Sequence, residues 1–121
     1  MSKRVLICDD SNIARQMIAE ALRDDGWEVV GEAPDGEKVV TMYKDMKPDA
    51  VTMDLCMSHS DGLEGLKGIR EHDPEAKIVV VSSLTRKDVV AEALRIGAVD
   101  YVPKPFVAEQ LQQSMAACCS S

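Results

Sequence analysis

The sequence predicts an α/β protein in which helices cover both faces of a five-stranded parallel sheet, a doubly wound arrangement. Strand-like and helix-like patterns alternate from end to end, and the segments between them are short. Alternation of this kind favours parallel strands, because a parallel connection needs a crossover long enough to hold a helix. No linker, repeat or low-complexity segment interrupts the pattern. We therefore expect residues 1–121 to form a single domain.

Hydrophobic spacing sets the expected bounds of each element. The strands are expected over residues 3–8, 27–33, 50–54, 77–81 and 99–102. The helices are expected over residues 12–25, 37–46, 63–71, 86–96 and 107–118.

The first β-α unit begins with the apolar run VLIC, which leads directly into two adjacent carboxylates, Asp9 and Asp10. Ser11 or Asn12 can cap the following helix, and Gly26 ends it. Helical spacing predicts one inward face on that helix, made of Ile13, Met17 or Ile18, and Ala21 or Leu22.

The second strand is more polar and is expected at a sheet edge. Turn residues, PDG at 34–36, lead into a helix with Val39, Met42 or Tyr43, and Met46 facing inward. The Lys-Pro pair at 47–48 ends that helix.

The last three units follow the same plan. The third strand ends on Asp54, and the loop 55–62 leads into the third helix. An apolar IVVV run forms the fourth strand, and Gly97 ends the fourth helix. The fifth strand runs into the segment PKP at 103–105.

Polar residues collect at the carboxyl ends of these strands, where ligands bind in open parallel sheets. They are Asp9, Asp10, Asp54, Ser82, Ser83 and Lys104. If the first and third strands are neighbours, the three carboxylates converge, and one lysine cannot neutralise them. A hard divalent cation can, and Mg²⁺ prefers oxygen ligands. A hydroxyl and a lysine beside a metal suit a phosphoryl group, which a carboxylate such as Asp54 can accept as a nucleophile.

Each feature taken singly has a more ordinary explanation. Paired aspartates at a strand end often cap a helix or form a turn, and for Asp9 and Asp10 alone that alternative is about as probable. Ser82 alone is typical of a solvated turn, and Lys104 alone of a surface. The metal and phosphoryl interpretation depends on four strand ends carrying complementary groups together.

Composition limits the partners. The formal net charge of −7 argues against binding the nucleic acid backbone or an anionic membrane surface. No apolar run approaches a membrane span, and the start of the chain does not resemble a signal peptide. We expect a cytoplasmic protein whose four cysteines are reduced and have no redox or metal role, with Cys8 in the core.

The combined motifs resemble the response-regulator receiver domain, most closely its stand-alone chemotaxis members. The resemblance covers essentially all 121 residues. The matching segments are VLICDD at 5–10, MDLCM at 53–57 with DG at 61–62, VVSS at 80–83, and GAVDYVPKPF at 97–106. It implies the flavodoxin-like (βα)5 sandwich with strand order 2-1-3-4-5.

The resemblance also implies roles for individual residues. Asp54 would accept a phosphoryl group from a histidine kinase, with autodephosphorylation as the only other chemistry. Lys104, Ser82 and the Ser83 amide would bind the phosphoryl group, and Tyr101 would move inward as an aromatic switch when Ser82 moves. The Mg²⁺ ligands would be Asp9, through water, with Asp10, Asp54 and the carbonyl of Cys56. The Lys104-Pro105 peptide bond would be cis.

Three positions depart from the family pattern. Ser58 replaces a usual proline, Ser60 replaces a usual apolar residue, and Pro103 directly precedes Lys104. The first two predict a more mobile loop at 56–61, where His59 is expected to be a solvent-exposed loop residue.

Output is expected through the surface of the fourth helix, fifth strand and fifth helix, since little chain remains for an output domain. The leading effector is the flagellar motor switch, and the alternative is another signalling protein or a phosphorelay, with a phosphatase ending the signal.

Three rival classes of protein are disfavoured. A haloacid-dehalogenase-like phosphohydrolase needs an aspartate where Cys56 stands, and a flavodoxin-like binder needs a phosphate cradle where Asp9 and Asp10 stand. A receiver-like interaction module would have lost part of the site.

Overall fold

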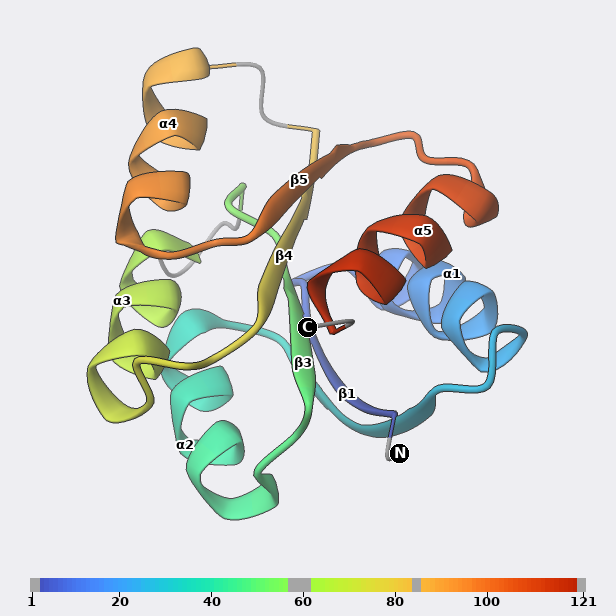
Figure 1. The fold of residues 1–121 in the computed structure, drawn as a ribbon, viewed down its shortest axis with the longest axis horizontal. Coiled ribbons are helices and arrows are strands. Elements are labelled where there is room, and N and C mark those ends of the chain that lie inside the picture. Colours follow the sequence, from blue (N-terminus) through green and yellow to red (C-terminus); the bar gives the residue numbers. More distant parts are fainter. Residues whose placement is uncertain (1–2, 57–61, 84–85, 120–121) are drawn as a thin grey trace.

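The computed structural model describes residues 3–56, 62–83 and 86–119, and these form five successive β-α units (Figure 1). The strands are β1 (Arg4–Cys8), β2 (Glu28–Ala33), β3 (Ala50–Met53), β4 (Ile78–Ser82) and β5 (Asp100–Pro103). The helices are α1 (Asn12–Arg23), α2 (Gly36–Met46), α3 (Gly62–His72), α4 (Lys87–Ile96) and α5 (Ala108–Cys118). The predicted alternation is confirmed, and the predicted bounds differ from these by one or two residues at most ends.

The five strands form one parallel sheet in the order β2-β1-β3-β4-β5. This confirms the predicted order and places the polar β2 at an edge. β1 has β2 on one side and β3 on the other, so the direction of winding reverses there. Ligands bind at such a reversal in open α/β sheets.

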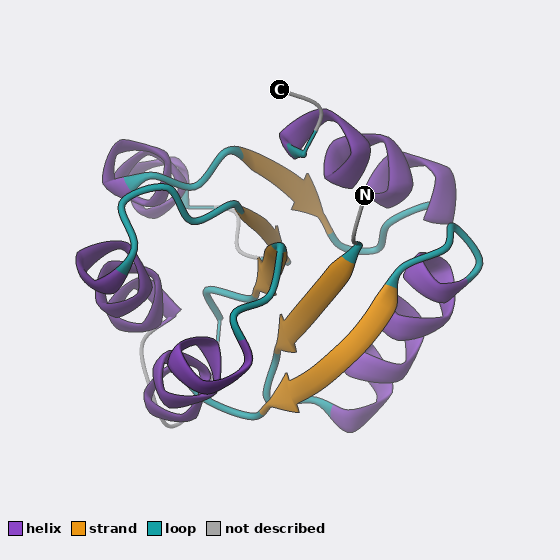
Figure 2. Cartoon of the chain, turned by 60° about the horizontal axis from the view of Figure 1, so that its bottom comes forward, coloured by secondary structure: helices purple, strands orange, loops and turns teal. Residues whose placement is uncertain are grey.

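Helices cover both faces of the sheet, with α1 and α5 on one side and α2, α3 and α4 on the other (Figure 2). Successive side chains of β1 alternate between the two layers, as the pleat of a strand requires. Val5 and Ile7 pack among residues of α1 and α5, and Leu6 and Cys8 pack among residues of α2 and α3. Burial on both faces explains the continuous apolar runs in β1 and β4.

Helix α1 buries a different face from the one predicted at its start. Ile18 and Leu22 are fully buried as expected, but Ile13 is 70% exposed and Met17 is 52% exposed. The buried stripe passes through Ile18 and Leu22 and extends at intervals of four residues to the half-buried Ala14, so Ile13 lies about 100° away from it. The prediction for Ile13 was wrong because α1 carries two neighbouring apolar stripes. Ile13 and Met17 lie on the exposed one, and Ile18 and Leu22 lie on the buried one.

The remaining predicted core positions are confirmed. Val39 and Tyr43 of α2 are buried, with Met46 packed against them. Cys8 is 1% exposed, and burial, followed by the negative charges of Asp35, Asp9 and Asp54, raises the pKa of its thiol to about 12. Cys8 is therefore a neutral core residue. Among the described residues, no helix has the length and apolar character needed to cross a membrane.

The cap of α2 provides a test of the predicted turn. The Asp35 side chain accepts a hydrogen bond of 2.8 Å from the amide of Lys38. We expect Asp35→Ala to lower the free energy of unfolding by about 1 kcal/mol, because that amide loses its partner. Asp35→Asn keeps an acceptor and should remain within a few tenths of a kcal/mol of wild type. Urea unfolding of the three proteins measures this, and equal losses in both variants would contradict the capping role.

Candidate functional site

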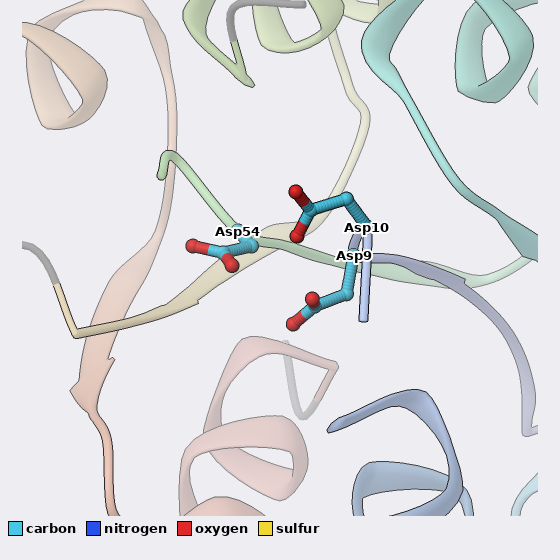
Figure 3. Close-up of side chains that lie close together, drawn as sticks. All are labelled: Asp9, Asp10 and Asp54. Carbon is cyan, nitrogen blue, oxygen red and sulfur yellow. The ribbon is translucent and has the colours of Figure 1, made fainter. Parts of the chain in front are cut away.

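The register of β1 and β3 brings the three predicted carboxylates together. Cys8 pairs with Met53, so the next residues, Asp9 and Asp54, leave the sheet side by side. The amide of Asp54 donates a 3.0 Å hydrogen bond to the carbonyl of Cys8. One carboxylate oxygen from each of Asp9, Asp10 and Asp54 lies within 4.8 Å of the other two (Figure 3). The predicted convergence of the three carboxylates at the carboxyl ends of the strands is confirmed.

Two of the three carboxylates are buried. Asp9 is 0% exposed and Asp54 is 5% exposed, whereas Asp10 is open to solvent. A backbone amide satisfies one oxygen of each buried group. Asp9 Oδ1 accepts from Ser11, and Asp54 Oδ1 accepts from Cys56, both at 2.9 Å. These bonds replace part of the hydration that the carboxylates lose on folding.

Lys104 satisfies the other oxygens of the two buried carboxylates. Its Nζ donates to Asp9 Oδ2 at 2.6 Å and to Asp54 Oδ2 at 3.2 Å. Burial alone would lower the pKa of Lys104, but the hydrogen bonds and charges of Asp9 and Asp54 outweigh it and raise the pKa above its usual value. Lys104 is therefore an ammonium ion at neutral pH.

The three carboxylates carry more negative charge than Lys104 neutralises, which favours a bound cation. Lys104 brings one positive charge to three carboxylates that lie within reach of one another. Carboxylate oxygens that converge on one point are the ligands that Mg²⁺ prefers. The donor set therefore fits Mg²⁺. The amide of Cys56 is bonded to Asp54, and the predicted metal contact of the Cys56 carbonyl stays a prediction.

Ser82 links the end of β4 to two other predicted residues. Its backbone carbonyl accepts a 3.0 Å bond from the amide of Lys104 and a 3.4 Å bond from the hydroxyl of Tyr101. Ser82 is fully buried and Tyr101 is half-buried. Ser83 follows it and is exposed. The structure thus joins Tyr101, Ser82 and Lys104 through one carbonyl oxygen.

Pro103 has a simple structural explanation. β5 is an edge strand, and Pro103 pairs with Ser82 of β4. The amide of the next residue, Lys104, points toward β4, so the nitrogen of Pro103 points away from the sheet, where an edge strand needs no donor. The Lys104-Pro105 peptide bond is cis, as the resemblance implies. Ser58, His59 and Ser60 lie outside the described residues.

A cavity of about 310 Å³ opens beside Lys104. Its lining is largely apolar and joins the first turns of α1 to the segment after β5. The lining residues are Ala14, Met17, Ser83, Lys104, Pro105 and Phe106. The exposed side chain of Met17, the alternative to Ile18 in the predicted inward face, forms one wall of this cavity.

Two residues shape the site in ways that the sequence did not predict. A Cβ on Gly62 would lie 2.3 Å from the carbonyl oxygen of Asp54, so only glycine allows α3 to begin against the phosphoacceptor candidate. Arg15 of α1 donates to the backbone carbonyl of Asp9. Gly62 carried a signal in the turn-like Asp-Gly pair, but an arginine inside a helix reads as an ordinary surface residue.

The crowding of charges predicts a metal-dependent stability. Asp10→Asn removes one negative charge, so we expect it to raise the thermal midpoint in chelator. Mg²⁺ should raise the free energy of unfolding of wild type by about 2.7 kcal/mol at a hundredfold excess over its dissociation constant. Asp10→Asn should abolish most of that increase. Asp45→Asn, at an exposed position on α2, is the matched control and should melt like wild type in both conditions. If Asp10→Asn melts below wild type in chelator, Asp10 is mainly a structural cap. If Mg²⁺ stabilises Asp10→Asn as much as it stabilises wild type, Asp10 is not a metal ligand.

Comparison with known proteins agrees with the fold and with the arrangement of the site. The family model of the response regulator receiver domain matches residues 5–116. The chemotaxis protein CheY of Thermotoga maritima is 41% identical over 115 residues, which are 95% of this chain and 96% of that protein. CheY of Bacillus subtilis is 39% identical over the same coverage of both chains.

Solved structures agree with these relatives. A complex of CheX and CheY with BeF3 and Mg²⁺ from Borrelia burgdorferi has a TM-score of 0.91 at 30% identity, covering 95% of this chain and 87% of that one. The response regulator domain of Thermotoga maritima CheB has a TM-score of 0.91 at 34% identity, covering 100% and 98%. Receiver domains bind Mg²⁺ in an acidic pocket and act as phosphorylation switches. The chain, in which three aspartates converge at the carboxyl end of the sheet, belongs to the response regulator receiver family of two-component systems and is CheY-like.

Proposed function

We propose that this chain stores a signal as a phosphoryl group on Asp54 and presents the change to a protein effector. The observation that supports it best is the buried Asp54 carboxylate, 3.2 Å from the ammonium group of Lys104 and within reach of Asp9 and Asp10. A carboxylate held between a cation and a metal site is positioned as a nucleophile toward phosphorus.

In the proposed transfer, an Asp54 oxygen attacks the phosphorus of a phosphohistidine on a histidine kinase. The phosphorus–nitrogen bond breaks and the imidazole leaves. Mg²⁺, when bound, neutralises the developing charge on the phosphoryl oxygens. Asp9, Asp10, Asp54 and the carbonyl of Cys56 would hold it, with Asp9 acting through water.

Other residues of the site then bind the product. Lys104 would exchange its bond to Asp9 for one to a phosphoryl oxygen, and the Ser82 hydroxyl and Ser83 amide would donate to the others. Because Ser82 shares its carbonyl between Lys104 and Tyr101, a shift of Ser82 toward the phosphoryl group would change the position of Tyr101. Tyr101 would thus carry the change to the surface of α4, β5 and α5.

Two apolar side chains on or next to these elements are exposed and could contact an effector. Leu94 of α4 and Val99, just before β5, are each 45% exposed. Exposed apolar side chains on the elements that carry the proposed switch Tyr101 would suit a partner that binds only one of the two states. We propose a single-domain cytoplasmic protein in chemotaxis, with the flagellar motor switch as effector, because the relatives named above are chemotaxis proteins of nearly equal length. A shuttle in a phosphorelay, or a regulator of another signalling protein, is the alternative.

The phosphoacceptor is tested directly by mass spectrometry. With Mg²⁺ and acetyl phosphate, wild type should gain the mass of one phosphoryl group. Asp54→Asn should gain none, because the amide is nearly isosteric but is not a comparable nucleophile. Asp45→Asn is the matched control and should be phosphorylated like wild type. Equal phosphorylation of Asp54→Asn would refute the assignment, and an unreactive wild type would favour an interaction module that does not use phosphate.

Lys104 should act on the phosphoryl group rather than on the metal. Beryllofluoride with Mg²⁺ serves as the phosphoryl analogue, and its binding is measured by the rise in thermal midpoint. We expect Lys104→Ala to weaken beryllofluoride binding roughly ten- to a hundredfold, since a hydrogen bond to a charged group contributes roughly 1.5–3 kcal/mol. Affinity for Mg²⁺ alone should be retained or raised, because lysine is not a metal ligand and its positive charge competes with a cation for Asp9 and Asp54. Lys44→Ala, on the exposed side of α2, is the control. Loss of Mg²⁺ affinity with beryllofluoride binding intact would reverse these roles.

A further inference from the structure

Arg15 connects three parts of the chain around the proposed metal site. Its side chain is only 13% exposed, although it lies at the end of the first turn of a surface helix. Nη1 donates to the backbone carbonyl of Asp9, Nη2 donates to the Asn12 side chain, and Nε donates to Glu32 Oε1 at 3.0 Å. One guanidinium therefore ties the β1–α1 loop, the start of α1 and the end of β2 together.

The bond to Asp9 has a consequence for Asp10. The carbonyl of Asp9 and the amide of Asp10 belong to the same planar peptide unit, so holding one fixes the plane of the other. The amide of Asp9 already donates to the Ala33 carbonyl at 3.0 Å, and Asp9 Oδ1 accepts from Ser11. The bond from Arg15 is a third hydrogen bond that holds Asp9, and it fixes the peptide unit that leads into the exposed Asp10.

We propose that Arg15 is a positioning residue of the metal site. It fixes the Asp9–Asp10 peptide so that the Asp10 carboxylate points at the Mg²⁺ position, and Glu32 orients the guanidinium for this task. The proposal rests on the proposed Mg²⁺-dependent function and assigns to Arg15 and Glu32 a role apart from metal ligation. Side chains that orient the ligands of a metal typically change its affinity roughly ten- to a hundredfold when they are replaced.

A purely electrostatic role for Arg15 makes the opposite prediction. A positive charge near three carboxylates competes with a cation, so its removal would raise Mg²⁺ affinity. Loss of positioning would lower it. Arg15→Lys separates the effects further, because lysine keeps the charge but lacks the planar fork that reaches Asp9, Asn12 and Glu32 together.

The experiment measures the Mg²⁺ dissociation constant by calorimetry for wild type, Arg15→Lys, Arg15→Met and Glu32→Gln. We expect both Arg15 variants to bind Mg²⁺ about tenfold or more weakly, and Glu32→Gln to show a smaller loss in the same direction. Arg95→Lys and Glu92→Gln, in a more exposed arginine–glutamate pair on α4, are the matched controls and should bind like wild type.

A second readout follows the peptide itself in metal-free protein. The ¹⁵N chemical shift of the Asp10 amide reports hydrogen bonding at the Asp9 carbonyl. It should move in Arg15→Lys and Arg15→Met and stay unchanged in the α4 controls. If Arg15→Met cannot be purified folded, Arg15→Lys still supplies both measurements and Glu32→Gln supplies the affinity.

The outcomes are distinct. Wild-type affinity in Arg15→Lys, or tighter binding in Arg15→Met, would overturn positioning in favour of charge alone. Lower stability with unchanged Mg²⁺ affinity would overturn it in favour of a packing role. A wild type that binds no Mg²⁺ would instead defeat the proposed function on which the inference rests.

Discussion

Two buried carboxylates, Asp9 and Asp54, share the ammonium group of Lys104 at the edge of the sheet, and a third, Asp10, lies beside them. Burying two like charges so close together is unfavourable unless each oxygen has a partner. Backbone amides and Lys104 supply those partners, and a charge imbalance remains. The proposed affinity for a cation and the proposed role of Asp54 as a nucleophile both depend on that imbalance.

The fold creates this arrangement by register rather than by local sequence. Parallel pairing of Cys8 with Met53 brings Asp9 and Asp54 together across 45 positions of chain, and the pairing of Ser82 with Pro103 places Lys104 opposite them. A slip of one residue in β3 would turn Asp54 to the other face of the sheet. The packing of β3 opposes that slip, because Val51 and Met53 lie in one core layer and Ala50 in the other, so core and site are set by the same contacts.

The sequence predicted the parts that depend on simple periodicity and on strand ends. The strand order came with the family resemblance, and β1–β3 adjacency then placed Asp9, Asp10 and Asp54 together. The prediction for Ile13 failed because two apolar stripes overlap in the first turn of α1, and only packing selects between them. Arg15 was missed for a different reason. A helical arginine has no pattern that distinguishes a solvated side chain from one that reaches back to a backbone carbonyl.

The central claim is that Asp9, Asp10 and Asp54 form one cation site, and Mn²⁺ provides its most direct test. Mn²⁺ takes the same oxygen ligands as Mg²⁺ and broadens the NMR signals of nuclei near it. At substoichiometric Mn²⁺, the account predicts that the amide signals of Cys8 to Ser11 and of Asp54 to Cys56 disappear first and return when Mg²⁺ is added in excess. Signals at the opposite end of the strands, such as Lys77 and Asp100, should persist. Broadening centred on another acidic surface, or broadening that Mg²⁺ does not reverse, would contradict it.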